Sequence, residues 1–596
     1  MESSQCLRFL RPYLFGLPPA DKAAYARLFS VSCMKPYCKS PSRGMLRQKR
    51  AFSVCGHAKS SRSHAADSED ALATSAARLT TVERRISKLR ENDALHFPRV
   101  GDRTGRMTIP AFRQKYQDKE STPASEVVTL EGRIMSLRHA GPKLAFIDIL
   151  GGYEQVQVMV RLGNLAEPSL DPAVFKKALY PLRRGDIISV TGTATRSTAG
   201  ELSLGALELP TILSPALAPL PEKLINEETK ILNRHIDLLV NRHVSDIIRL
   251  RSHIIKSMRD FFHDQEFLEV QTPILADSAG GAIARPFWTT ATAFSEKKLS
   301  MRIAPELWLK RLVVGGNDKV FEIGPCFRNE GLDPTHNPEF TTCEFYSAYS
   351  NLNDLIKITE NLINHLAHEV RTTVDSRLPS LVGQRLPIAE GGPFKQVEFI
   401  PGLQDKLGFT FPDLSKPDSL EKLTALLAEH NAAPPHSTEP SLNRLLDYLA
   451  ARHLETESDS QPLFVIHHPS CMSPLSKSFV CPKTGQLVSA RAELFIGGRE
   501  MANMYEEEND PFEQRRKFQL QLQSKANNAV TDQEGPSEID ESYVRALEHG
   551  LPPTGGWGCG IDRLVMLFSG ASRISDTLPF GNLKNIVSLS KAAKDS

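Results

Sequence analysis

The pattern of hydrophobic and polar residues divides the chain into a strand-rich region and a helix-rich region. Between residues 126 and 213, short apolar and polar runs alternate and are separated by glycines, which predicts β-strands. Five such strands, with a helix over residues 172–182 before the fourth, are typical of an OB-fold β-barrel. The predicted strands span residues 127–135, 144–149, 156–160, 186–193 and 201–204.

From Asn233 onward, long amphipathic helices alternate with strands, which predicts a larger α+β domain. One helix is predicted over residues 251–262, and a strand that ends at a proline follows over residues 267–273. Residues 373–460 show a weaker pattern, and we interpret them as an insertion in this domain. Residues 214–221 are rich in proline and predict a stiff linker between the two regions.

A basic helix is predicted ahead of the barrel. Apolar residues at positions 82, 86 and 89 recur at helical spacing, and Arg84, Arg85 and Lys88 lie on the opposite side. Such a face either binds phosphates of RNA or is an ordinary solvated helix surface. The expected boundaries are 1–55 for a leader, 56–77 for a disordered linker, 78–120 for a basic helical extension, 125–215 for the barrel, 216–230 for a second linker and 231–590 for the α+β domain, with its insertion at about 373–460.

The composition is that of a soluble globular protein, with 40% hydrophobic and 24% charged residues among 596. No apolar run is long enough to span a bilayer, so no membrane association is expected. The net charge of +2 is unevenly distributed. Residues 1–62 carry 12 Lys or Arg and 2 Asp or Glu, a balance of +10, and the remaining 60 basic and 68 acidic residues give −8.

The basic N-terminus is rich in arginine and serine and poor in acids, as mitochondrial transit peptides are. We therefore expect residues 1–55 to direct the protein to the mitochondrial matrix. Residues 50–53 and 27–30 each resemble a matrix-protease site, and the sequence does not choose between them. The alternative is a basic tail that binds RNA or nothing, and internal starts at Met34 or Met45 leave a second form open.

Two segments carry candidate chemistry. Residues 321–331 and 335–341 predict a strand, a loop and a strand that bear Arg328, Glu330, His336 and Phe340. This set suits a nucleoside triphosphate, because an arginine binds phosphate, a carboxylate accepts from an adenine amino group and an aromatic ring stacks on the base. Residues 555–567 place Arg563 behind a glycine-rich turn. Together, the two segments resemble motifs 2 and 3 of class II aminoacyl-tRNA synthetases.

The resemblance implies an antiparallel-sheet catalytic domain flanked by helices, which makes an aminoacyl adenylate from ATP. Arg328 is expected to contact the α-phosphate and the substrate carboxylate, and Arg563 the γ-phosphate; these two are the implied catalytic residues. Glu493 and Glu500 are the implied Mg²⁺ ligands, since carboxylate oxygens and phosphates suit that ion. Residues 251–273 resemble motif 1, which implies a homodimer. The implied ATP-binding residues are Arg328, Glu330, His336, Asn337, Phe340, Glu493, Gly558 and Arg563.

Further matches at residues 234–238, 280–287, 302–307, 309–316, 472–477, 497–503 and 546–553 are similar to lysyl-tRNA synthetases of class IIb. A lysine ammonium needs carboxylate and hydroxyl acceptors and no nearby cation. The resemblance implies that Glu507 and Tyr346 bind the ε-ammonium of L-lysine. The full set implied to bind lysine is Gly281, Glu306, Glu344, Tyr346, Asn503, Tyr505 and Glu507.

The resemblance also makes the barrel an anticodon-binding domain for tRNA(Lys). Phe146 is expected to stack on a base, Gln157 to read a base edge and Arg133 to bind phosphate, with Gln155 competing with Gln157 as the reader. By its position alone, Phe146 more often belongs to a barrel interior.

Three alternatives compete with a mitochondrial enzyme of this family. An aspartyl- or asparaginyl-type enzyme would need a cation where Glu507 stands. A non-catalytic RNA-binding or tRNA-import factor would have damaged motifs, whereas Arg328, Glu330, Glu493, Glu500 and Arg563 are all present. A truncated relative that lysylates a protein would lack the barrel.

Overall fold

The computed structural model describes residues 80–101, 105–117, 126–166, 171–277, 280–281, 284–383, 388, 392–432, 441–527 and 539–592. The expected leader and the linker at 56–77 lie outside the described residues. Within the ranges just given, no helix combines the length and the apolar character that a membrane crossing requires.

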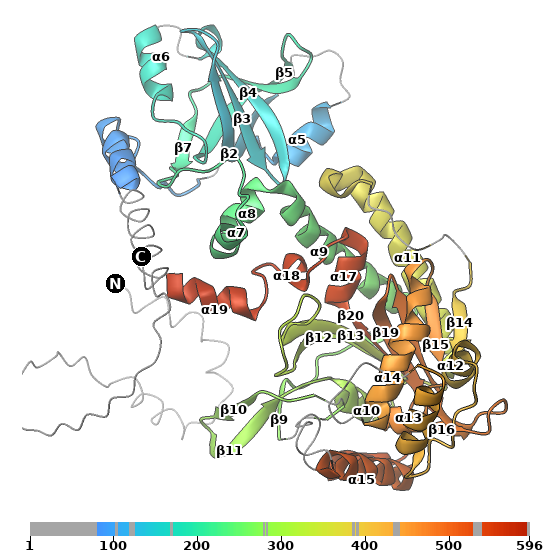
Figure 1. Ribbon diagram of the computed structural model, residues 1–596. Coiled ribbons are helices and arrows are strands. Elements are labelled where there is room, and N and C mark those ends of the chain that lie inside the picture. Colours follow the sequence, from blue (N-terminus) through green and yellow to red (C-terminus); the bar gives the residue numbers. More distant parts are fainter. Residues whose placement is uncertain are drawn as a thin grey trace, which may run out of the picture. The chain divides into compact units, whose positions relative to one another are not determined.

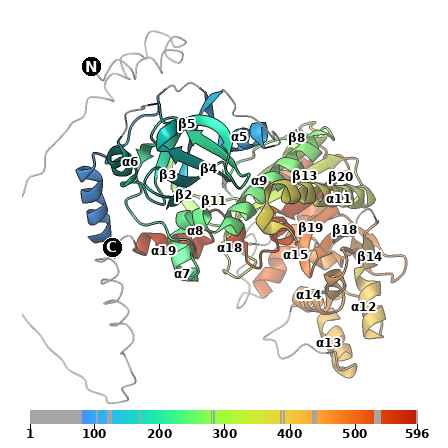
Figure 2. The same cartoon turned by 90° about the horizontal axis from the view of Figure 1, so that it is seen from above.

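The strand-rich region forms a closed barrel (Figure 1 and Figure 2). The sheet order is β1-β2-β3-β4-β6-β5-β7, and an additional pairing of β2 with β5 closes it. This arrangement confirms the predicted OB-fold, including the helix before β5. The elements are β1 (Arg106–Met107), α5 (Ile109–Tyr116), β2 (Val127–His139), β3 (Leu144–Gly151), β4 (Glu154–Arg161), η2 (Leu162–Asn164), α6 (Pro172–Leu179), β5 (Ile187–Arg196), β6 (Leu202–Ala206) and β7 (Thr211–Ser214).

Residues 80–91 are helical, as predicted, but the prediction for Arg85 is wrong. Its guanidinium is buried and donates to both carboxylate oxygens of Asp186, at 3.0 and 2.8 Å, and to Pro181 O at 2.6 Å. Arg85 therefore faces the barrel with Leu89, whereas Arg84 is exposed. The ion pair between Arg85 and Asp186 of the barrel places this arginine on the buried side of the helix. Helical periodicity cannot predict such a pair, because it counts every arginine as polar. The predicted extension thus shares the barrel core.

The helix-rich region is built on an eight-stranded sheet in the order β14-β15-β18-β19-β20-β13-β12-β8. Neighbouring strands from β15 to β12 are antiparallel, and the two outer strands are parallel to their neighbours. This confirms the predicted antiparallel sheet. The strands are β8 (Leu268–Glu269), β12 (Lys319–Phe327), β13 (Glu339–Ala348), β14 (Lys395–Glu398), β15 (Leu463–Ile466), β18 (Arg491–Ile496), β19 (Arg499–Glu506) and β20 (Thr554–Gly560).

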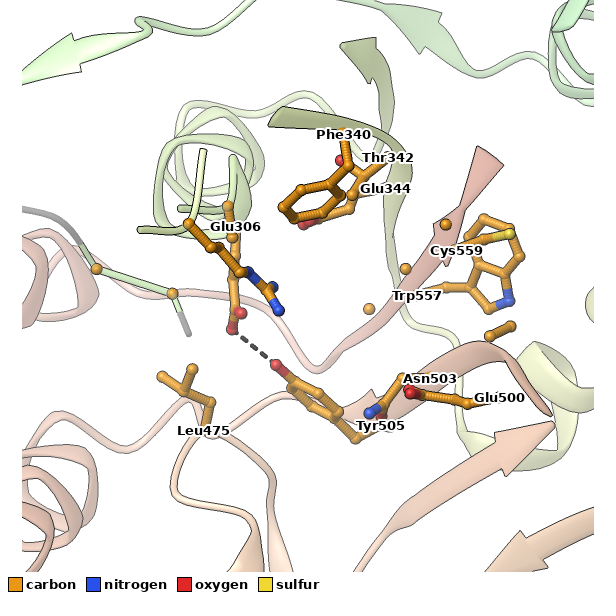
Figure 3. A pocket seen from close by; sticks show the side chains of 18 of the residues that line it. Glu306, Phe340, Thr342, Glu344, Leu475, Glu500, Asn503, Tyr505, Trp557 and Cys559 are labelled. Atoms are coloured by element: carbon orange, nitrogen blue, oxygen red, sulfur yellow. Dashed lines mark hydrogen bonds between the residues drawn. The ribbon is translucent and has the colours of Figure 1, made fainter. Parts of the chain in front are cut away.

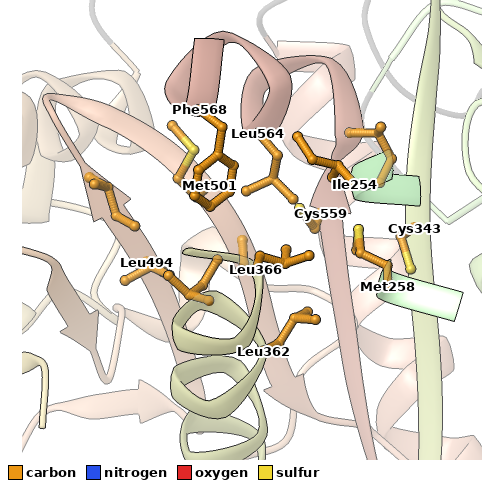
Figure 4. Packing of buried hydrophobic residues seen from close by; sticks show 14 of the residues in the cluster. Ile254, Met258, Cys343, Leu362, Leu366, Leu494, Met501, Cys559, Leu564 and Phe568 are labelled. Atoms are coloured by element: carbon orange, nitrogen blue, oxygen red, sulfur yellow. The ribbon is translucent and has the colours of Figure 1, made fainter. Parts of the chain in front are cut away.

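Three helices cover one face of this sheet: α9 (Arg242–His263), α11 (Leu352–Arg377) and α17 (Ile561–Ser569). Helices α9 and α11 lie side by side in both views. A capping box at Asn351 and Asp354 fixes the start of α11. Figure 4 shows how the three helices and four strands contribute to one apolar core, with labelled side chains Ile254, Met258, Cys343, Leu362, Leu366, Leu494, Met501, Cys559, Leu564 and Phe568.

The predicted insertion at 373–460 begins inside α11 and contains a small helical unit. Helices α12 (Phe399–Leu407), α13 (Ser419–Glu429) and α14 (Leu442–His453) form their own apolar core with residues of β15 and β18. The remaining elements are α7 (Glu227–Leu232), α8 (Arg234–Val240), β9 (Leu275–Ala276), β10 (Trp288–Ala291), β11 (Phe294–Met301), α10 (Glu306–Val314), η3 (Pro379–Leu381), η4 (Glu455–Asp459), η5 (Ser470–Met472), β16 (Ser478–Val480), β17 (Leu487–Ser489), α15 (Pro511–Asn527), α16 (Glu541–Leu547), α18 (Ile574–Thr577) and α19 (Leu583–Ala592).

Candidate active site

The sheet face opposite the helices forms one wall of a cavity of about 500 Å³ (Figure 3). Side chains along a strand alternate between the two faces. On β13, Cys343 and Phe345 lie in the helix-covered core, whereas Glu344 and Tyr346 line the cavity. Helix α10 and the loop at 472–476 contribute further walls.

The structure brings most of the predicted substrate residues together around this cavity. Glu493 and Glu507 are the two predicted residues of this domain that do not line it. Those that do are Gly281, Glu306, Arg328, Glu330, His336, Asn337, Phe340, Glu344, Tyr346, Glu500, Asn503, Tyr505, Gly558 and Arg563.

One end of the cavity carries arginines that are partly exposed. The guanidinium of Arg563 donates to Glu500 Oε2 at 3.1 Å and lies 2.9 Å from His336 Nε2. The other ring nitrogen of His336 lies 2.7 Å from Asp333 Oδ2. Although desolvation opposes the shift, hydrogen bonds from Thr335 and His336 lower the pKa of Asp333 to about 2. Glu500 and His336 therefore orient Arg563, and Asp333 in turn holds the ring of His336.

Arg328 and Phe340 meet where the β12–β13 hairpin opens. Phe340 pairs with Cys326 in the sheet register, and the Arg328 guanidinium lies 5.1 Å from the centre of the Phe340 ring. Arg328 Nε also donates to Ile303 O at 3.4 Å. The hairpin thus places a cation beside an aromatic face, which is the arrangement that a nucleotide phosphate and base require.

The other end of the cavity is acidic and buried. Glu306, the first residue of α10, accepts from the Tyr505 hydroxyl at 2.9 Å, as the dashed line in Figure 3 shows. It also accepts from Lys310 Nζ at 2.5 Å, and Lys310 forms an ion pair with Glu507. The side chains of Lys310 and Glu507 are both 0% exposed.

The expectation that no cation lies near Glu507 is therefore wrong. Lys310 follows Glu306 by four residues, so both side chains project from the same face of α10. That spacing was visible in the sequence, but a lysine on an amphipathic helix is usually solvated. Only the buried position of this helix face makes the residue part of the site.

Burial shifts the pKa of the carboxyl groups at the acidic end. It raises the pKa of Glu344 to about 8, with a further contribution from the charge of Glu306. Burial likewise raises the pKa of Glu507, although Lys310 opposes the shift. The Tyr346 hydroxyl lies 3.4 Å from Glu344 Oε2. Burial therefore favours the protonated form of Glu344 and Glu507, and a nearby cation favours their ionised form.

Glu493 lines a neighbouring cavity of about 140 Å³. Its Oε1 accepts from Arg491 and, at 3.0 Å, from Asn503, and its Oε2 lies 3.2 Å from His468 Nε2. Despite the opposing effect of burial, Arg491 and His468 lower the pKa of Glu493. Arg491, which sequence reasoning missed, also donates to Met472 O and Ser473 Oγ, both at 3.0 Å. It thereby holds a loop of the main cavity.

The two carboxylates that the sequence paired as Mg²⁺ ligands thus line different cavities. Glu500 lines the main cavity with its side chain 38% exposed, whereas both oxygens of Glu493 are already engaged. Within the described part of the chain, no group of three or more His, Cys, Asp or Glu residues is arranged to hold a metal ion.

On the barrel, the predicted anticodon residues lie on β2, β3 and β4. Phe146 is half-buried between the inward-facing Ala145 and Ile147, so its ring lies on the outer face. Gln157 is 5% exposed; it donates to Glu201 at 3.1 Å and accepts from Ser203 at 3.2 Å.

Gln155, two residues before Gln157 on the same strand, is exposed. Arg133 donates to Gly185 O at 2.8 Å. The outer face therefore presents the ring of Phe146 and the exposed amide of Gln155, whereas the amide of Gln157 is buried and hydrogen-bonded.

Comparisons with known proteins agree with both domains. Residues 226–584 match the family of tRNA synthetases class II (D, K and N), and residues 128–211 match the OB-fold nucleic acid binding domain. The chain is 42% identical over 497 residues to "Lysine--tRNA ligase, mitochondrial" of Schizosaccharomyces pombe, covering 82% of this chain and 91% of that protein.

Two other relatives carry similar names. "Lysine--tRNA ligase" of Lactococcus lactis subsp. lactis is 39% identical over 481 residues, which is 79% of this chain and 92% of that protein. "Lysine--tRNA ligase, mitochondrial" of Saccharomyces cerevisiae is 37% identical over 513 residues, or 80% of this chain and 87% of that protein. These similarities extend across both the barrel and the sheet domain.

Proposed function

The chain belongs to the class II tRNA synthetases (D, K and N), and we propose that it is a lysine–tRNA ligase of mitochondria. The enzyme activates L-lysine with ATP to lysyl-adenylate and transfers the lysyl group to tRNA(Lys) for mitochondrial translation. Relatives of that name and the acidic end of the cavity support the lysine specificity.

The acidic end carries the proposal. Two buried carboxyl groups, Glu306 and Glu507, share the ammonium of Lys310, and the buried carboxyl group of Glu344 adds to the charge of Glu306. A lysine side chain brings the cation that this excess of carboxyl groups needs, and Tyr346 and Tyr505 offer hydroxyl groups beside it. An aspartate side chain would add a further carboxylate, and an asparagine side chain would leave the excess uncompensated.

At the other end, catalysis requires positioning and stabilisation of charge more than covalent participation. The lysine carboxylate attacks the α-phosphorus of ATP, and pyrophosphate leaves. Arg328 neutralises the α-phosphate and holds the carboxylate, Phe340 stacks on the base and Glu330 accepts from the adenine amino group. Arg563, oriented by Glu500 and His336, takes the γ-phosphate.

Of the two predicted Mg²⁺ ligands, Glu500 lines the main cavity, and Glu493 lines the neighbouring one with its oxygens hydrogen-bonded. Mg²⁺ is commonly bound by one or two carboxylates together with substrate phosphates, and Glu500 is partly exposed in the cavity beside Arg563. When bound, the ion would neutralise phosphate charge. Glu493 instead orients Arg491 and Asn503, because its oxygens bind those two residues and His468.

The barrel binds the anticodon of the tRNA. Phe146 offers a stacking surface on its outer face, and Arg133 offers positive charge. The side chain of Gln155 is exposed and has no hydrogen bond within the described part of the chain, so it can reach a base edge. Gln157 reads a base only by giving up its bonds to Glu201 and Ser203.

Dimer formation and location complete the proposal. Strand β8 lies at the outer edge of the sheet, and its residue Leu268 is 51% exposed. Such an apolar edge next to α9 suits a homodimer through motif 1. The basic leader and the mitochondrial relatives support import into the matrix.

The test is amino-acid-dependent ATP–pyrophosphate exchange, with each of the twenty amino acids offered separately to protein that lacks residues 1–55. Exchange with lysine alone is the expected result. Folded protein that exchanges with no amino acid would reject the ligase function, and exchange with aspartate or asparagine would reject the specificity.

A further inference from the structure

Lys310 places an internal ammonium at the acidic end of the cavity. Its side chain is 0% exposed, and its Nζ lies 2.5 Å from Glu306 Oε1 and forms an ion pair with Glu507. The rings of Tyr346, Tyr505 and Tyr543 surround it, with centroids between 5.7 and 5.9 Å from Nζ. Aromatic faces and carboxylates are the groups that stabilise a buried cation.

Glu507, its partner, lies immediately behind the cavity wall. Gly556 and Tyr346 line the cavity, and Glu507 does not. A Cβ added to Gly556 would lie 1.9 Å from Glu507 Oε1 and 2.6 Å from Tyr346 Cε1, so only a glycine allows this arrangement. Apart from the ion pair with Lys310, neither oxygen of Glu507 has a hydrogen bond within the described residues.

From this arrangement we infer that Lys310 is a specificity-determining residue, which competes with the substrate side chain for Glu507. Lys310 holds the carboxylate of Glu507 behind the cavity wall. A substrate with its own ammonium draws Glu507 toward the cavity, and a substrate with a neutral side chain does not. The inference rests on the proposed lysine specificity.

The physical argument concerns the charge of Glu507. A buried carboxyl without a cation takes up a proton, and a neutral carboxylic acid distinguishes weakly between an ammonium and a methyl group. The ion pair with Lys310 opposes the effect of burial and favours the ionised form of Glu507 before substrate arrives, so that exchanging one ammonium partner for another costs little. A neutral side chain offers no replacement and leaves the ion pair intact.

The test compares lysine with norleucine, which has the same carbon chain without the ε-amino group. Lys310→Met removes the internal cation at similar volume, and Lys310→Arg retains it. In ATP–pyrophosphate exchange, Lys310→Met is expected to lower the ratio of kcat/KM for lysine to that for norleucine at least tenfold, through the KM for lysine. The KM for ATP is expected to stay unchanged, and Lys310→Arg is expected to recover most of the ratio.

A purely structural role predicts a different result. If Lys310→Met lowers kcat/KM equally for lysine and norleucine, so that their ratio is unchanged, the inference is overturned. A crystal structure of the wild-type enzyme with lysine gives an independent test if the variant does not fold. Glu507 should then contact the ligand ammonium and lie farther from Lys310, and an unaltered Glu507–Lys310 pair would reject the competition. Failure of the proposed function itself would appear separately, as wild-type protein that does not exchange with lysine.

Discussion

The two ends of the cavity hold their charges in different ways. At the arginine end, Arg563 and Glu500 have side chains that are 26% and 38% exposed, and imidazole and carboxylate neighbours orient them. At the acidic end, Glu306 and Lys310 have side chains that are 6% and 0% exposed, and the two form an ion pair with each other.

This difference separates two tasks. An exposed end can admit a large, highly charged ligand such as ATP, whose phosphates it neutralises during the reaction. A buried end makes every unpaired charge costly, so it discriminates between side chains that differ by one ammonium. Changes at the acidic end should therefore alter lysine binding, and changes at the arginine end should alter turnover and ATP binding.

The largest effect is expected from Glu507→Gln, which keeps the volume of the side chain and removes its charge. Loss of the carboxylate partner of a buried ammonium typically costs about 3–5 kcal/mol, which raises the KM for lysine between about 100-fold and 5,000-fold. Steady-state exchange kinetics measure this, with Glu513→Gln on the exposed side of α15 as the matched control. An equal increase in the KM for ATP would contradict the separation of the two ends.

Arg563→Ala should mainly affect turnover. Removing one preorganised donor for transition-state charge typically lowers kcat by about 10²–10³, while lysine binding measured without ATP stays unchanged. Arg573→Ala, at an exposed arginine of the same C-terminal region, serves as the control. Weakened lysine binding in Arg563→Ala alone would show that the two ends are not independent.

A smaller effect is expected from pH. Because burial and the charge of Glu306 raise the pKa of Glu344 to about 8, this carboxyl is mostly protonated at pH 6 and ionises as the pH rises. Binding a cation favours the ionised form, so the KM for lysine should fall by up to about tenfold per pH unit between pH 6 and 8. Glu344→Gln should make the KM for lysine nearly independent of pH in this range. A wild-type KM for lysine that rises with pH would contradict the prediction.

The smallest effect is expected from Asp333→Asn, which weakens the support of His336 behind Arg563. The pair between Asp333 and His336 is half-exposed, and exposed ion pairs contribute little. The KM for ATP should therefore change by at most about fivefold, as measured by exchange at saturating lysine. A change larger than tenfold would mean that the arginine end depends on this pair as strongly as the acidic end depends on burial.

Much of the fold followed from the sequence because periodicity reports which face of an element is buried. The five barrel strands and the helix before β5 were predicted in this way. Local motifs also led to many of the cavity residues, since the β12–β13 hairpin and the β20–α17 turn keep Arg328, Phe340 and Arg563 at fixed places in a known register.

The sequence did not indicate which side chains from distant segments pair in the folded protein. The sequence pattern did not single out Lys310, and it placed Arg85 on the side of its helix away from the apolar residues. Each is instead buried against a carboxylate from a distant segment, Glu507 and Asp186 respectively. For Glu493, which the resemblance implied as a Mg²⁺ ligand, the sequence did not reveal that Arg491, His468 and Asn503 bind its oxygens. Such side-chain pairings depend on tertiary packing and have no periodic signal.

The central claim is that the buried acidic end recognises a side-chain ammonium. Isothermal titration calorimetry of the wild-type protein with lysine, norleucine and arginine, each without ATP, tests it most directly. The account predicts that lysine binds and that norleucine and arginine bind at least 100-fold more weakly. Norleucine binding with an affinity close to that of lysine would contradict it.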